Sequence, residues 1–185
     1  MQARDPLMIE HRLIENMLHH LKHELDQVEK TKSIDPYLVD KAVDFIRVYA
    51  DRTHHGKEED ILFRRLQKKK LTDIDRQAME ELIEEHVFSR KTTKALVQAN
   101  ERYRKGDSSA LDEIKTCLKT LIDFYPKHIQ KEDKVFFPAT RIYFSDEEDK
   151  AMLAAFWEFD RMIIHEKYGA VVKEFALKGR QESKV

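Results

Sequence analysis

Histidine and glutamate interrupt the apolar stripe of each of the first four predicted helices. In four segments apolar residues recur every three or four positions, the spacing that places side chains on one face of an α-helix. At the centre of each stripe, ionisable residues take the place of apolar ones. The stripes read Leu7, His11, Ile14, Leu18; Ile46, Ala50, His54, Glu58, Ile61; Met79, Leu82, His86, Ser89; and Leu121, Tyr125, His128, Glu132, Phe136. The chain therefore has to bury polar groups together with its core.

The six ionisable groups on these stripes could not be buried without partners. They are His11, His54, Glu58, His86, His128 and Glu132. An unpartnered buried carboxylate or imidazole costs several kcal/mol, and six of them would exceed the ~5–15 kcal/mol stability of a domain. Two divalent cations would cancel this penalty, because imidazole nitrogen and carboxylate oxygen are metal ligands. The pattern predicts a buried metal site made by these six side chains.

The polar positions also form an internal repeat. His54 and Glu58 recur as His128 and Glu132, 74 positions later. The pair Glu10-His11 recurs as Glu85-His86, 75 positions later. Each unit is a helix with one histidine followed by a helix with His-x-x-x-Glu. Folded antiparallel, the two units would place two equivalent half-sites around a pseudo-two-fold axis, which indicates two metals.

The remaining sequence favours an all-α fold. Hydrophobic residues make up 41% and charged residues 37% of the 185 residues, with only four Gly and four Pro. We expect an antiparallel up-down four-helix bundle over about residues 5–140 and an additional C-terminal helix over about 146–178. This length suits one domain, residues 1–185. Helices are expected from about residues 6, 36, 72 and 109, with short loops between them.

Charge and cysteine content exclude several classes of protein. The net charge is −1 and both signs alternate along the chain, so we expect no nucleic-acid partner. Cys117 is the only cysteine, which excludes an intrachain disulfide, a zinc–thiolate site and an iron–sulfur cluster. No stretch has the ~18 apolar residues that cross a membrane, and no signal peptide is recognised, so the expected location is cytoplasmic.

Other histidines compete for a place at the site. His55 also has a glutamate four residues on, Glu59. At 100° per residue, however, His54 lies closer to the apolar face than His55, so His54 and Glu58 are preferred as ligands. His55 and Glu59 are then expected to be supporting or surface groups. Three histidines near the start are expected on a solvated face: His19, His20 and His23. His165 either covers the site from the last helix or packs against the bundle.

Nitrogen and oxygen ligands without thiolate suit iron best, with manganese or zinc as alternatives. A haem held by two histidines would leave Glu58 and Glu132 unexplained. A ferritin-like carboxylate site would need Glu-x-x-His and more glutamates. Neither alternative fits the sequence.

Four segments resemble the haemerythrin-like, or HHE cation-binding, family. They are Glu10-His11-Arg12-Leu13-Ile14; residues 54–63, HHGKEEDILF; Glu85-His86; and residues 128–138, HIQKEDKVFFP. The resemblance covers about residues 5–140, with all four helices in order. It implies a non-haem di-iron centre in an antiparallel four-helix bundle. It also implies that His11, His54, His86 and His128 are terminal ligands and that Glu58 and Glu132 bridge two irons.

The chain departs from oxygen-carrying haemerythrins at two places. They have a second histidine four residues after that of the third helix, where this chain has Arg90. They also end with His-x-x-x-x-Asp, where this chain has His128-x-x-x-Glu132. A fifth histidine is therefore absent or comes from elsewhere.

We hypothesise a di-iron protein that binds or senses O₂, NO or peroxide. The alternatives are a di-iron enzyme with peroxidase-like, NO-reducing or iron-delivery activity, and a bundle in which metal serves only stability. No catalytic residue or organic cofactor is predicted, and a protein partner is not indicated. Tyr125, one turn from His128, could belong to an electron or proton path of the enzyme.

Overall fold

The computed structural model describes the backbone of residues 2–182 and the side chains of residues 2–165 and 167. The fold is all-α, as predicted, and the described residues contain no strand. The elements are α1 Arg4–Thr31, α2 Pro36–Asp44, η1 Phe45–His55, η2 Glu58–Phe63, α3 Arg64–Leu66, α4 Asp73–Arg104, α5 Ala110–Lys131, η3 Glu132–Phe136, α6 Phe137–Thr140, η4 Arg141–Tyr143 and α7 Asp146–Glu182.

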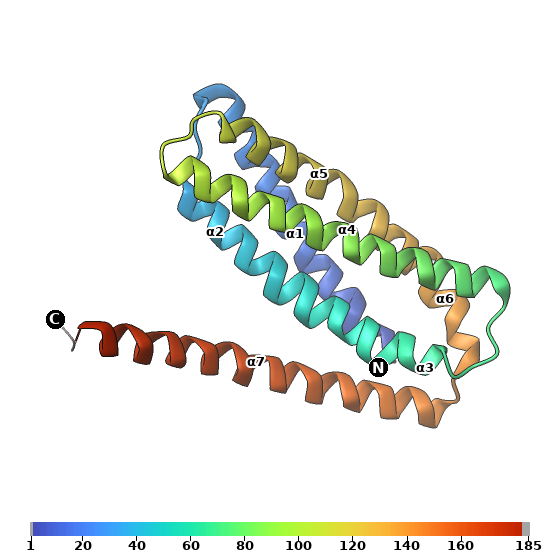
Figure 1. Ribbon diagram of the computed structural model, residues 1–185. Coiled ribbons are helices and arrows are strands. Elements are labelled where there is room, and N and C mark those ends of the chain that lie inside the picture. Colours follow the sequence, from blue (N-terminus) through green and yellow to red (C-terminus); the bar gives the residue numbers. More distant parts are fainter. Residues whose placement is uncertain (1, 183–185) are drawn as a thin grey trace.

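Four long helical rods form the bundle, and consecutive rods run in opposite directions (Figure 1). The second rod is continuous from α2 through η1 and η2 to α3, and the fourth runs from α5 through η3 to α6. The first rod contacts the second and fourth, and the third contacts the same two. Each rod therefore has two neighbours, and all four face one central axis.

Parts of the second and fourth rods are π-helical. The segments η1, η2 and η3 have this wider turn, in which an N–H bonds to the carbonyl five residues earlier, as Gly56 does to Asp51. π-Helical turns are rare and occur mostly at functional sites. Here they contain His54 and Glu58 of the first repeat unit and Glu132 of the second, whereas His128 lies in α5.

Side-chain caps begin two of the rods at the predicted places. Asp35 accepts a hydrogen bond from the backbone N–H of Tyr37, with Pro36 in the first turn. Thr72 accepts one from the N–H of Asp75 at 3.1 Å. Gly106, with φ +97°, follows the end of α4 and lets the chain turn towards α5. These signals explain why the expected and observed helix starts agree.

Two apolar clusters fill the bundle, one towards each end. One contains Ile14, Ala50, Leu96 and Leu121, and the other contains Leu7, Leu62, Leu82 and Phe136. Along every rod, the predicted polar positions lie between a residue of the first cluster and a residue of the second. The ionisable side chains are therefore enclosed in a layer between two apolar regions.

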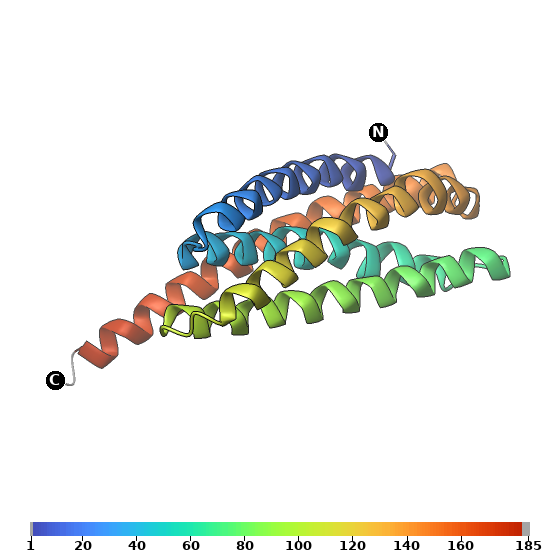
Figure 2. The ribbon, with the colours of Figure 1, turned by 90° about the horizontal axis from the view of Figure 1, so that it is seen from above.

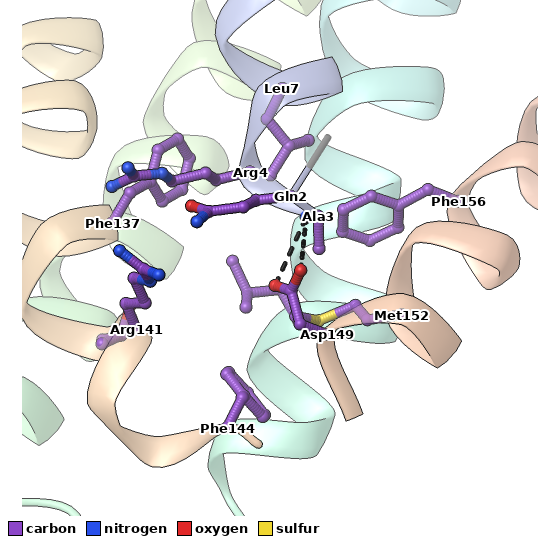
Figure 3. A pocket seen from close by; sticks show the side chains of 12 residues that line it. Gln2, Ala3, Arg4, Leu7, Phe137, Arg141, Phe144, Asp149, Met152 and Phe156 are labelled. Carbon is purple, nitrogen blue, oxygen red and sulfur yellow. Dashed lines mark hydrogen bonds between the residues drawn. The ribbon is translucent and has the colours of Figure 1, made fainter. Parts of the chain in front are cut away.

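The helix α7 packs along the second rod, against η1 and η2. Its side chains Met152 and Phe156 are buried in the second apolar cluster. Figure 3 shows its first turn beside the start of α1, where Asp149 accepts hydrogen bonds from the N–H of Ala3 at 3.1 and 3.3 Å. A cavity of about 30 Å³ lies there. Its lining includes none of the six predicted ligands, so it is separate from the polar layer.

The end of α7 extends past the bundle, beyond the connection between α4 and α5 (Figures 1 and 2). The helix reaches Glu182, a few residues further than expected. Among the described residues, no helix combines the length and apolar character that crossing a bilayer requires.

Two neighbouring aromatic residues on α7 test how firmly it is docked. Phe156 is fully buried, whereas Trp157 is 53% exposed. We expect Phe156→Ala to lower the free energy of unfolding by about 3–5 kcal/mol, because it leaves a cavity. Trp157→Ala should change it by less than about 0.5 kcal/mol. Urea denaturation of both variants measures the difference; equal effects would contradict this packing of α7.

Candidate metal centre

Seven ionisable side chains meet in the polar layer of the bundle. Each is at most 2% exposed: His11, His54, His55, Glu58, His86, His128 and Glu132. They come from all four rods. The set contains all six residues predicted as ligands, together with His55.

These side chains form two groups of potential metal ligands. One group is His11, His54, Glu58 and Glu132, and the other is His55, Glu58, His86 and His128; within each, the ligand atoms lie within 4.8 Å of one another. Glu58 belongs to both. Glu132 also reaches both, since its Oε2 lies 3.1 Å from Nε2 of His11 and its Oε1 lies 3.3 Å from Nε2 of His128. The two groups of potential ligands therefore adjoin, with Glu58 common to both and Glu132 in contact with histidines of both.

Most of the atoms that face this space have no hydrogen-bond partner. They are the Nε2 atoms of His55, His86 and His128, and both carboxylate oxygens of Glu58 and Glu132. Buried polar atoms are nearly always hydrogen-bonded, so a concentration of orphans requires an explanation. All of these atoms are lone-pair donors of the kind that divalent transition metals bind. The residues present therefore fit a pair of cations.

A carboxylate contacts Nδ1 of each of the five histidines. The pairs are His11 with Asp133 at 2.8 Å, His54 with Glu10 at 2.9 Å, His55 with Asp51 at 3.4 Å, His86 with Glu59 at 2.7 Å and His128 with Glu85 at 2.7 Å. Because a carboxylate accepts hydrogen bonds, Nδ1 carries the proton and donates it. The lone pair of Nε2 then points into the layer. This carboxylate–histidine arrangement is typical of metal-binding histidines, which it orients and makes more basic.

Four cations neutralise these outer carboxylates. Lys57 contacts Glu10, Lys131 contacts Glu85 at 2.5 Å, Arg12 contacts Asp133, and Arg90 contacts Glu59 at 2.6 Å and Asp51 at 2.7 Å. The site is therefore built in three concentric layers, with inward ligands, then carboxylates, then cations. Arg90, which replaces an expected histidine, belongs to the outermost layer.

The three layers follow the repeat found in the sequence. The chain of contacts from Lys57 through Glu10 to His54 has its counterpart in the chain from Lys131 through Glu85 to His128. Likewise, the contact of Glu59 with His86 corresponds to the contact of Asp133 with His11. Each of these carboxylates adjoins one inward residue in the sequence but contacts an inward histidine of another helix. Glu10, for example, precedes His11 and contacts His54.

His55 breaks this symmetry. The residue 74 positions later is Ile129, which is buried in an apolar cluster. One group of ligands therefore has three imidazoles and the other has two. The ring of His55 stacks on that of His86, with centroids 3.9 Å apart, and is fully buried. A fifth histidine is present after all, on the helix before the one expected.

His55 is not a surface group, because its side chain is fully buried among the potential ligands. The expectation of a surface position rested on 100° of rotation per residue, which holds for an α-helix. The wider turn of η1 rotates less per residue, so His54 and His55 both face inwards. The one hint in the sequence is Asp51, four residues before His55, which pairs with it. Glu59 lies beside His86, whose Nδ1 it contacts at 2.7 Å.

The other histidines lie elsewhere. His19, His20 and His23 are exposed on α1, as predicted. His165 on α7 is also exposed, so it neither covers the site nor packs in the core.

The pKa values show how strongly the layer holds positive charge. Burial disfavours a charged His11, but the carboxylates of Asp133 and Glu132 outweigh it and raise the pKa of His11 to about 10. His86 has its pKa raised well above the ordinary value against the same opposing burial, by Glu132, Glu58 and Glu59. Burial and the nearby His86 and His128 lower the pKa of His55. Without a metal, protons on selected histidines neutralise the carboxylates.

A family model described as the hemerythrin HHE cation binding domain matches residues 3–161. This range contains all seven inward side chains, the carboxylates around them and the part of α7 that packs on the bundle. Comparison with curated proteins and comparison with solved structures each gave no significant match.

Protein stripped of metal should lose stability as the pH rises. The folded pKa of His11, about 10, exceeds its ordinary value of 6.5, so the folded state binds an extra proton between these values. This contribution is complete below pH 6.5 and disappears as the pH passes through about 10. Denaturant unfolding of chelator-treated protein from pH 7 to pH 10 should show the decline, and His11→Gln should make it shallower. An unchanged slope in His11→Gln would refute this role of His11.

Proposed function

Because the chain belongs to the hemerythrin HHE cation-binding family, we propose that it holds a non-haem di-iron centre that binds or senses a small ligand, namely O₂, NO or peroxide. One observation carries the proposal: Nε2 and carboxylate atoms from four helices converge, buried and mostly unpartnered, on two adjoining positions. Such a layer is too costly to bury unless cations occupy it.

The donors support iron. His11 and His54 would hold one ion, and His55, His86 and His128 would hold the other. Glu58 and Glu132 would bridge the two. Nitrogen and oxygen donors without sulfur favour iron, with manganese or zinc as alternatives. When bound, the ions would supply redox and ligand-binding chemistry, while the outer carboxylates hold each imidazole in its metal-binding tautomer.

The unequal donor sets support ligand binding on the side of His11 and His54. That side has two imidazoles where the other has three, so an ion held there would have more coordination positions free for a ligand. The layer lies between two apolar clusters, and the ring of Phe137 stacks on His11 at 5.9 Å. This environment favours a small, weakly polar ligand over a large or highly charged one. We also propose a cytoplasmic location, since a single cysteine provides no intrachain disulfide.

A di-iron enzyme with peroxidase-like or NO-reducing activity is the second candidate, favoured by Tyr125. This side chain is 1% exposed, its hydroxyl has no hydrogen-bond partner, and its ring stacks on His55 at 6.2 Å. Burial raises the pKa of the Tyr125 hydroxyl, so it stays protonated at neutral pH. It would be placed to give a proton or an electron to the centre.

The metal content of the purified protein tests the centre itself. We expect two irons per chain by elemental analysis. His55→Asn should reduce this towards one, because only the three-imidazole group loses a ligand, and Glu58→Ala should reduce it further, because Glu58 belongs to both groups. His20→Asn, at an exposed position, is the control and should keep both irons. Fewer than about one transition metal per chain in the unaltered protein would overturn the proposal.

Stopped-flow spectra of the reduced, iron-loaded protein with O₂, NO and peroxide test the ligand. A stable absorption band after mixing is expected for binding or sensing. Repeated consumption of peroxide or NO that Tyr125→Phe slows at least tenfold would establish the enzyme instead. A protein that binds two irons and responds to none of the three ligands would leave metal with a structural role only.

A further inference from the structure

A fully buried lysine connects α7 to the polar layer. Lys57 is 0% exposed, and its ammonium contacts Glu10 of α1 and Asp160 of α7, the latter at 2.6 Å. The other oxygen of Glu10 accepts a hydrogen bond from Nδ1 of His54 at 2.9 Å. A continuous chain of charged contacts therefore leads from α7 through Lys57 and Glu10 to a ligand of the candidate centre.

A close approach of two helices holds this connection in place. Gly56, next to Lys57, has ordinary helical φ, so its backbone does not require glycine. A Cβ at this position, however, would lie 2.8 Å from Cζ of Phe159 on α7. Real Cβ contacts are essentially never so short. The absence of a side chain at Gly56 thus lets α7 sit close enough for Asp160 to reach Lys57.

The second half of the repeat has the same chain of contacts without α7. Lys131 contacts Glu85, which accepts from Nδ1 of His128. The second acidic partner of Lys131 is Glu81, at 3.3 Å, which belongs to α4. The side chains of Lys131 and Glu81 are 31% and 47% exposed, so water screens their charges. Lys57, in contrast, is shielded from water and depends on α7 for its second partner.

We propose that Lys57 is a positioning residue through which the docking of α7 adjusts the reduction potential of the metal held by His11 and His54. The inference rests on the proposed di-iron centre. Glu10 attracts the Nδ1 proton of His54 and so makes its Nε2 a stronger donor. Lys57 weakens this attraction by sharing the charge of Glu10, and Asp160 in turn draws Lys57 towards α7. Movement of α7 would therefore change the donor strength of His54.

This arrangement predicts shifts of opposite sign from two neighbouring variants. In Asp160→Asn, Glu10 becomes the only charged partner of Lys57, so Lys57 weakens the pull of Glu10 on His54 more strongly. The reduction potential of the metal should therefore become more positive. Lys57→Met removes the positive charge that opposes Glu10, so His54 becomes a stronger donor. The reduction potential should therefore become more negative. In the double variant the potential should match that of Lys57→Met, because Asp160 acts only through Lys57. A purely structural role would not give opposite signs.

Gly56→Ala separates docking from charge. The new methyl group would displace the ring of Phe159, and an outward movement of α7 with the ring would draw Asp160 away from Lys57. The potential should then shift in the same direction as in Asp160→Asn, although no charge has changed. Glu81→Gln is the matched control in the other half-site, and its shift should be smaller because that half is solvated.

The experiment is spectroelectrochemical titration of iron-loaded full-length protein, with iron content and thermal unfolding measured on the same samples. Opposite shifts in Asp160→Asn and Lys57→Met, and a positive shift in Gly56→Ala, are the expected results. Unchanged potentials in Asp160→Asn and Gly56→Ala at two irons per chain would overturn this inference and leave the proposed function standing. If Lys57→Met does not fold, those two variants still decide the matter. If the unaltered protein proved to contain no iron, both the proposed function and this inference would be overturned.

Discussion

The burial of seven ionisable side chains between two apolar clusters is the constraint on which this structure depends. Five imidazoles and two carboxylates cannot remain there unless their charges are balanced. The protein balances them in layers, because each outer carboxylate both orients a histidine and contacts a cation, with Arg90 shared by Glu59 and Asp51. The polar network therefore spreads from the bundle axis to the surface, and it joins all four rods.

Much of this could be predicted from the sequence. The three-or-four-residue spacing identified the rods, and the interruptions at His11, Glu58 and their counterparts identified the buried layer. The repeat indicated two half-sites, and the structure contains two groups of buried side chains that could each hold a metal ion. These predictions succeeded because spacing along an α-helix determines which side chains share a face.

The rest depended on features that spacing does not encode. The π-helical turn of η1 brings His55 inwards, and the only local residue that hints at this is Asp51, which pairs with His55. The carboxylate next to one ligand supports a ligand on another helix, as Glu10 supports His54. To predict such pairings, one would need to know how far each helix is shifted along the bundle axis relative to its neighbours. The contact of Lys57 with Asp160 joins residues 103 positions apart and follows from the docking of α7.

The π-helical turn also bears on how such a site can change over generations. A turn closed by a bond to the fifth residue back holds one residue more than an α-helical turn. Losing one residue between Phe45 and His55 would narrow one of these wide turns and rotate the two adjacent histidines about the helix axis, so that one of them would leave the polar layer. A donor can therefore be gained or lost here by insertion or deletion, without any substitution. Alignments that forbid gaps inside helices would pair His55 with the wrong residue of a related chain.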